Sequence, residues 1–298
     1  MNKYIKSIAL LIPAVAMLAS CSMFQLDNYD GPNAEVTGKF YDVVTGEKQG
    51  VEVAYNAPYA SWGYYDYQML TTGALTVTEL DYVSPNWGGD PADYKAEGEQ
   101  YWLVRFDGQF TNTRVFAAKY RFSTKMLPFY EPEESKNTFT LEKGRNVVNI
   151  GVLPFCRIKD PVVTYDAANK KVIAKFYVEL SDPTRANKVS SVALCGNTQL
   201  FVGCNYQNLA SNDAGAKAKN VTPGELITLE IDANANTTLF GKNKNTGEQY
   251  VQDRYFRIAA MAEGNGFNTS KLYNFSPTYK LSADLSTIEE AQWDEVEW

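Results

Sequence analysis

Alternation of apolar and polar residues in short runs restricts the fold of this chain more than any other feature. Every second residue is apolar at 172–178, and the same period recurs at 256–262. Gly, Asn, Asp and Pro separate these runs, and no long segment has the period of an amphipathic helix. A period of two places alternate side chains on opposite faces of a strand, so that one face can be buried. The sequence therefore predicts an all-β fold.

Two β-sandwich domains in series are expected from a chain of 298 residues whose pattern changes near Pro154–Pro161. We place the domains at 33–155 and 156–285. A hairpin that turns at Asn169–Lys170 opens the second domain, where the spacing of strands suits an immunoglobulin-like sandwich. A capping box at Ser286–Glu289 predicts a short helix, which an acidic tail follows. Helix and tail together span residues 286–298.

The first residues have the pattern of an export signal. Lys3 and Lys6 precede an apolar run at 8–18, which predicts a signal peptide over residues 1–20. Leu18–Cys21 resembles the bacterial lipobox, which implies a lipid on Cys21 and a polar linker over 21–32. Ser22 after that cysteine implies the outer membrane, and we expect the cell surface. Since no later run approaches about 18 apolar residues, the lipid is the only membrane attachment expected.

Composition removes several classes of chemistry. The net charge of −7 argues against nucleic acid as a partner. The chain has no histidine, which excludes Ser-His-Asp and Cys-His nucleophiles and histidine metal sites. Gly88–Pro91 is a turn and not a phosphate loop, and no regular calcium loop occurs. A glycosidase with two carboxylates needs no histidine, but no pair can be assigned from sequence. We expect no catalytic residue, no cofactor and no metal site.

Three cysteines follow Cys21, and an odd number cannot all be paired in disulfides within the chain. Cys156 is expected in the core. Cys195 and Cys204 flank a predicted turn at Gly196–Thr198 and are a candidate disulfide, because an oxidising periplasm permits one. The alternative is that both are small buried apolar side chains.

Tyr and Trp are concentrated between Tyr55 and Trp102, where eleven residues are of these types and none is Phe. Such rings combine an apolar face with a polar tip, which suits a sugar-binding surface on loops. The candidate ligand-binding residues are Trp62, Tyr64, Tyr65, Tyr67 and Trp87. The alternative is that these rings pack the first sandwich. Tyr101 and Trp102 are adjacent on a strand, so at least one should be core.

Short motifs in the first domain resemble the prealbumin-like, carboxypeptidase-regulatory sandwich. They are Val36–Asp42, the turn Thr45–Glu47, the turn Asp107–Phe110 and the strand Tyr120–Phe122. These motifs, together with the lipobox, Val152–Ile158 and Asn274–Ser276, resemble a Bacteroidetes family of outer-membrane lipoproteins of unknown function (domain of unknown function 3823). The resemblance spans nearly the whole mature chain. The chain departs from the family pattern at 115–120, which lacks an expected glycine.

The resemblance implies an accessory of an outer-membrane glycan-capture system, beside a transporter barrel and a glycan-binding lipoprotein. It supplies no catalytic residues. We therefore expect a non-enzymatic cell-surface lipoprotein that binds polysaccharide or oligosaccharide through its Tyr/Trp-rich loops. The alternative is a structural or protein-interaction subunit of an outer-membrane complex with no affinity for sugars.

Overall fold

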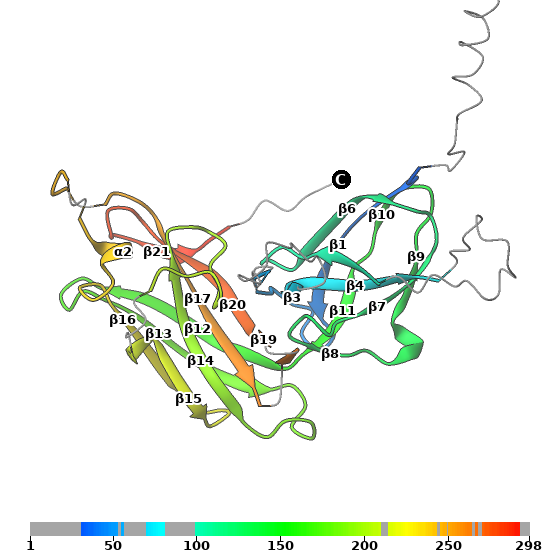
Figure 1. The fold of residues 1–298 in the computed structure, drawn as a ribbon. Coiled ribbons are helices and arrows are strands. Elements are labelled where there is room, and N and C mark those ends of the chain that lie inside the picture. Colours follow the sequence, from blue (N-terminus) through cyan, green and yellow to red (C-terminus); the bar gives the residue numbers. More distant parts are fainter. Residues whose placement is uncertain are drawn as a thin grey trace, which may run out of the picture.

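The regular secondary structure of the described residues is almost entirely β-strand, which confirms the all-β prediction (Figure 1). The computed structural model describes residues 31–52, 55–56, 70–80, 99–209, 214–242, 245–248, 250–263, 266–267 and 270–292. Helical turns in these residues are short: η3 (Glu134–Lys136), η4 (Ala214–Ala216) and α2 (Thr237–Phe240). No helix among them has the length and apolar character needed to cross a membrane.

The first unit pairs a mixed sheet with an antiparallel sheet. The long strand β1 pairs in parallel with β10 and then β11, and antiparallel with β6. The mixed sheet has the order β10-β1-β11-β8, and the antiparallel sheet has the order β5-β4-β7-β9. The strands of the first unit are β1 (Ala34–Asp42), β2 (Tyr55–Asn56), β3 (Leu70–Thr72), β4 (Ala74–Glu79), β5 (Glu99–Leu103), β6 (Gln109–Val115), β7 (Lys119–Ser123), β8 (Phe129–Tyr130), β9 (Thr138–Thr140), β10 (Gly144–Val147) and β11 (Ile150–Pro154).

Aromatic rings fill the space between these two sheets. Phe40 on β1 packs against Phe110 and Phe129, with ring centroids 5.6 and 5.3 Å apart. Trp102 on β5 lies 5.7 Å from Tyr120 on β7 and is only 3% exposed, whereas its neighbour Tyr101 is half-buried. This confirms that one of the two adjacent rings is core, because successive strand residues face opposite sides.

The second unit also encloses its core between two sheets. One sheet has the order β12-β13-β16, and the other has the order β15-β14-β17-β20-β21. Buried apolar side chains of both sheets form one cluster, which includes Phe176 on β13 and Phe256 on β17. Its strands are β12 (Cys156–Asp166), β13 (Lys171–Leu180), β14 (Val189–Asn197), β15 (Lys217–Val221), β16 (Ile227–Asp232), β17 (Arg254–Ala262), β18 (Gly266–Phe267), β19 (Ser270–Lys271), β20 (Asn274–Leu281) and β21 (Ile288–Glu290).

The hairpin predicted at the start of this unit is confirmed. Val163 pairs with Ala174 and Tyr165 with Val172, on either side of a turn that ends at Lys170. Lys170 has a φ of 54°, the left-handed conformation that such tight turns require. Cys156 is buried in the core of this unit, as predicted.

The helix predicted from Ser286 is wrong for the described residues 286–292, because β21 pairs with β20 instead. Ser286 does not cap a helix: its hydroxyl donates to Asp284, and its backbone N–H to Asp284 and to the Ser282 hydroxyl. These bonds make the turn that returns the chain onto β20, where Ile288 packs against the core. Tertiary pairing therefore overrides a local capping signal.

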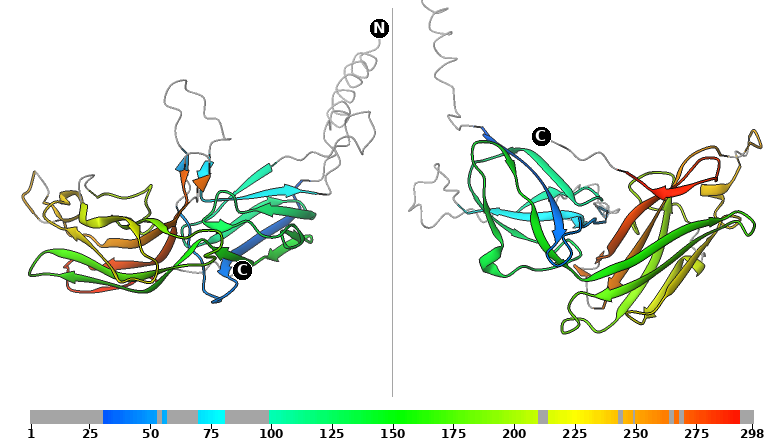
Figure 2. Two further views of the ribbon diagram at one scale, coloured as in Figure 1. Left: turned by 90° about the horizontal axis from the view of Figure 1, so that it is seen from below. Right: turned by 180° about the vertical axis from the view of Figure 1, so that it is seen from behind.

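The chain passes from the first unit to the second at Phe155, between the end of β11 and the start of β12. Figure 2 shows the two units side by side, and they meet at a junction near this connection. Side chains from both units meet there.

Candidate functional site

The ligand-binding residues predicted from sequence, Trp62, Tyr64, Tyr65, Tyr67 and Trp87, lie outside the described residues. The same is true of Cys21, the predicted lipid site. The described residues place a different set of polar and aromatic side chains together, at the junction of the two units.

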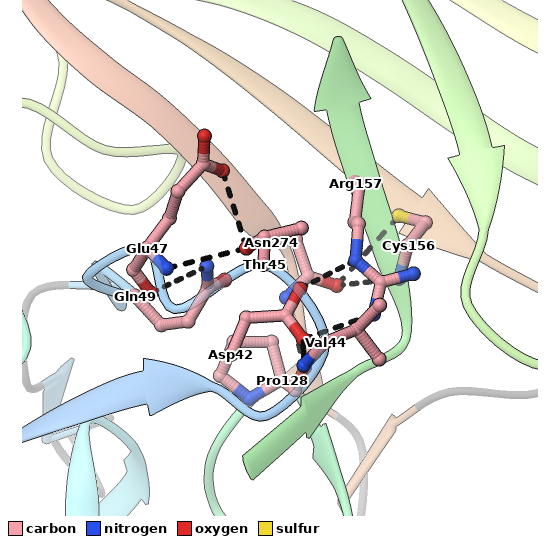
Figure 3. Close-up of polar contacts among 9 residues, drawn as sticks. All are labelled: Asp42, Val44, Thr45, Glu47, Gln49, Pro128, Cys156, Arg157 and Asn274. Carbon is pink, nitrogen blue, oxygen red and sulfur yellow. Dashed lines mark hydrogen bonds and ion pairs between the residues drawn. The ribbon is translucent and has the colours of Figure 1, made fainter. Parts of the chain in front are cut away.

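An ion pair between Asp42 and Arg157 forms the first contact across the junction (Figure 3). Nε and Nη2 of Arg157 both donate to the Asp42 carboxylate, with 3.0 Å between Nη2 and Oδ1. Burial alone raises the pKa of Asp42. The bonds from Arg157 and from the Val44 N–H outweigh that effect, so the pKa lies below its usual value. The fork of two charge-assisted bonds fixes the end of β1 against the start of β12.

Arg257 carries a second positive charge into the junction. This β17 residue is 3% exposed and donates to three carbonyl oxygens: Val51 at 3.0 Å, Phe106 at 2.9 Å and Ser276 at 3.1 Å. Burial lowers the pKa of Arg257 to about 10, and the charge of Glu52 partly opposes that shift. Gly50 allows this approach, since a Cβ there would lie 2.0 Å from Nη2 of Arg257. The guanidinium therefore joins the two units through backbone of both.

Glu52 makes the reciprocal contact from the first unit. Its carboxylate is buried and accepts the backbone N–H groups of Cys204 at 2.8 Å and Asn205 at 3.3 Å. Asn274 adds a neutral link, because its amide donates to the Pro128 carbonyl and its oxygen accepts the Cys156 N–H (Figure 3). Buried polar groups are costly unless they are paired, so these contacts specify one relative orientation of the two units.

A cleft of about 610 Å³ opens beside these contacts. Residues 47–50 and 106–107 of the first unit line it, and residues 156–161 and 274–279 of the second unit face them, together with Arg257 and Glu290. Four acidic and four basic residues are among those that line the cleft, so charges of both signs surround it. In the part of the chain that the structure describes, no group of three or more Cys, Asp or Glu residues is placed to hold a metal ion.

Three aromatic rings extend from the cleft across the junction. Phe106, which lines the cleft, lies 6.5 Å from Phe201, and Phe201 lies 5.2 Å from Tyr206. Phe201 is 37% exposed and Tyr206 is 41% exposed. We call these three residues the junction strip, and the segment 198–209 that carries two of them the strip loop. The first unit supplies one ring and the second unit supplies the other two.

The strip loop also contains the second cysteine of the predicted pair. Cys195 lies near the end of β14 and is buried, and its sulfur is 3.3 Å from that of Cys204. The turn predicted at Gly196–Thr198 is wrong in form, because β14 continues to Asn197 and Cys204 lies in a loop, whereas the strand that pairs with β14 begins only at Lys217. A loop brings Cys204 back onto the face of β14 instead. Both cysteines are unbridged thiols in this structure.

The junction strip is not predictable from the pattern of Tyr and Trp, because two of its three residues are Phe, which is common in cores. The turn predicted at Asp107–Phe110 is confirmed, since Gly108 has a φ of 84°. The turn places Phe106 at the cleft, but only the fold brings Phe201 beside it.

Comparison with known proteins gives matches only among solved structures: no family model and no curated protein matches this chain. A candidate carbohydrate-binding protein of Bacteroides uniformis is 25% identical with a TM-score of 0.62, and the match covers 85% of this chain and 100% of that one. A DUF3823 family protein of Parabacteroides merdae is 19% identical with a TM-score of 0.57, over 85% and 100% of the two chains. A DUF3823 family protein of Bacteroides ovatus is 17% identical with a TM-score of 0.52, over the same shares of 85% and 100%.

These names describe binding or an unknown function, and none of them describes a catalytic activity. The resemblance inferred from the sequence motifs is confirmed in three dimensions. Over 85% of its length, this chain matches the structures of DUF3823 family proteins from Bacteroides and Parabacteroides.

Proposed function

We propose that this protein is a non-enzymatic lipoprotein of the outer membrane, displayed at the cell surface, that binds polysaccharide. The observation that carries the proposal is the junction strip beside a polar cleft, in which the half-buried ring of Phe106 from the first unit adjoins the exposed rings of Phe201 and Tyr206 from the second. Exposed aromatic rings in contact with one another are unusual on a surface without a ligand, since they leave apolar area in water.

A glycan matches both parts of this site. The C–H face of a pyranose ring stacks on an aromatic face, and its hydroxyl groups need donors and acceptors. The rings of the strip provide the aromatic face, and the charged and polar side chains that line the cleft provide the donors and acceptors. A chain of sugars can contact several rings in succession, so polysaccharide fits better than a single sugar.

Two further observations support the proposal. The relative from Bacteroides uniformis, a candidate carbohydrate-binding protein, aligns over its whole length. In addition, the segment from Tyr55 to Trp102 is rich in Tyr and Trp, and Trp62, Tyr64, Tyr65, Tyr67 and Trp87 would supply further rings of the same kind. We include them in the proposed binding surface.

The anchor and the domain types belong to the same proposal. Cys21 would carry the lipid, and residues 21–32 would hold the first unit away from the membrane. The first unit would be a prealbumin-like sandwich and the second an immunoglobulin-like one. The partners would be an outer-membrane transporter or a second glycan-binding lipoprotein in the same system.

Affinity electrophoresis and glycan arrays with the chain from residue 22 onward test the proposal. Phe201→Ala and Tyr206→Ala should each weaken binding by about 1 kcal/mol, or roughly fivefold, because each removes a stacking ring. Trp62→Ala and Trp87→Ala test the sequence-predicted loops in the same way. Tyr177→Ala is the matched control, since Tyr177 is 36% exposed but lies on β13, outside the strip. Binding that is unchanged in all four variants would contradict the proposed site.

A rigid spacer or partner-binding subunit is the second candidate. The buried contacts of Asp42, Glu52 and Arg257 hold the two units in one orientation, as a spacer requires. In that case the protein should co-purify with an outer-membrane complex and bind no sugar on the array.

A further inference from the structure

The strip loop is held to strand β14 by hydrogen bonds, most of them to the side chain of Asn197. One backbone–backbone bond joins the two, from the Asn208 N–H to the Gly196 carbonyl at 2.8 Å. The Asn197 amide donates to the Tyr206 carbonyl at 3.1 Å, and its oxygen accepts the Gln199 N–H and the Asn208 amide, each at 3.1 Å. Gly203 and Tyr206 exchange backbone bonds within the loop, and Glu52 of the first unit accepts two N–H groups from it. These constraints are all non-covalent, so a covalent link to β14 would hold the rings more firmly.

Cys195 and Cys204 are placed to supply that constraint. Their sulfurs are 3.3 Å apart, and Val202 and Ala259 pack around them in a small apolar cluster. A further approach of about 1 Å reaches sulfur–sulfur bonding distance. The two residues are nine positions apart, so the bond would close a short loop whose middle carries Phe201.

The third cysteine does not compete for this bond. Cys156 is in the core of the second unit, where its sulfur contacts the Ala260 carbonyl at 3.6 Å. Burial raises the pKa of Cys156 to about 12, which keeps it a thiol. The pKa of Cys204 is also raised, by its contact with Cys195 and by burial. The thiolate of Cys204 is therefore disfavoured once the loop has packed, and the bond should form as the chain folds.

We infer that Cys195 and Cys204 are joined by a disulfide bond in the exported protein, and that this bond fixes the strip loop to strand β14. The oxidation removes two electrons and two protons from the thiols. A disulfide-bonded oxidoreductase of the cell envelope accepts them, through a mixed disulfide, and its own disulfide becomes two thiols. The bond would also stabilise the backbone N–H groups of Cys204 and Asn205 that hold Glu52, and thus the junction itself.

Intact-mass and peptide mapping test the bond directly. The full chain is expressed with export, denatured in N-ethylmaleimide and digested. We expect Cys156 to be alkylated, and a peptide pair linked through Cys195 and Cys204 that separates only after reduction. Alkylation of both Cys195 and Cys204 in the exported chain, or linkage of either to Cys156, would overturn the inference. Mapping detects a covalent bond and no ligand, so its outcome is independent of glycan binding.

A second measurement tests what the bond does. Hydrogen exchange at the Cys204 and Asn205 amides should be faster in Cys204→Ser than in the unmodified chain, and the Tm should fall by roughly 5–10 °C. Cys156→Ser is the control variant, and it should leave the linked peptide pair intact. Equal amide exchange in the unmodified chain and Cys204→Ser would refute the claim that the bond fixes the loop.

Discussion

The ion pair between Asp42 and Arg157 should be worth several kcal/mol to the folded chain, which a double-mutant cycle can measure. Asp42→Asn keeps the shape of the carboxylate but removes its charge. Arg157, 13% exposed, then loses its bonded counter-charge and keeps only the weaker influence of Glu179 and Glu47. Arg157→Met does the opposite and leaves a fully buried carboxylate with the backbone N–H of Val44. In the double variant neither charge remains.

The expected magnitudes follow from burial. Removing one partner of a buried pair costs about 3–5 kcal/mol, because the other charge is left unpaired. Asp42→Asn should cost about 3 kcal/mol, since Arg157 keeps some access to water, and Arg157→Met about 4 kcal/mol. The double variant should cost about 4 kcal/mol, well below the sum, which gives a coupling energy of about 3 kcal/mol.

Urea unfolding followed by far-UV circular dichroism gives these free energies. Glu263→Gln is the matched control, because Glu263 pairs with Lys188 at 2.8 Å on an exposed surface. That change should cost less than about 0.5 kcal/mol. If the costs of Asp42→Asn and Arg157→Met are additive within about 0.5 kcal/mol, the pair does not couple the two units and the reasoning is wrong.

Three further outcomes can be checked with the same methods. The pKa of Asp42 is lowered on folding. Its contribution to stability is therefore present above the unfolded pKa near 4 and is lost as the pH falls through the lower folded pKa. The free energy of unfolding should therefore fall less steeply with acid in Asp42→Asn than in the unmodified chain. Phe176→Ala should lower the free energy of unfolding by about 3–5 kcal/mol, because Phe176 is fully buried, whereas Tyr177→Ala should have little effect. Gly108→Ala should be destabilising by at least about 1 kcal/mol and should reduce glycan binding, because Gly108 has a φ of 84° and a Cβ would lie 1.9 Å from the Gln49 carbonyl beside the cleft.

Strands were predictable where one face is buried along the whole strand. β13 is an example: its buried residues Val172, Ala174, Phe176 and Val178 are the apolar positions of the pattern. The helix predicted from the capping box at Ser286 does not form, because the Ser286 hydroxyl donates to Asp284 and Ile288 pairs with the open edge of β20. Local signals of this strength, about 1 kcal/mol, lose to pairing and burial.

The junction was less predictable than either unit. Its contacts join residues more than a hundred positions apart, such as Asp42 with Arg157 and Val51 with Arg257. One sequence does not show which residues pair across the junction, because a buried arginine and an exposed arginine have the same letter in it. The cysteine pair could be suspected from its spacing, but the loop that brings Cys204 onto β14 could not.

The rigidity of the junction has a consequence for recognition. Phe106 belongs to one unit, whereas Phe201 and Tyr206 belong to the other, so the strip exists only while the units keep one orientation. If the units moved freely, ordering them on a glycan would oppose binding, because conformational freedom would be lost. The buried contacts of Glu52 and Arg257 remove that freedom before any ligand arrives. Asp42→Asn changes no ring and no residue that lines the cleft, but it loosens the junction, so it should weaken glycan binding as a strip variant does. Binding at a site confined to one unit would be unchanged in that variant.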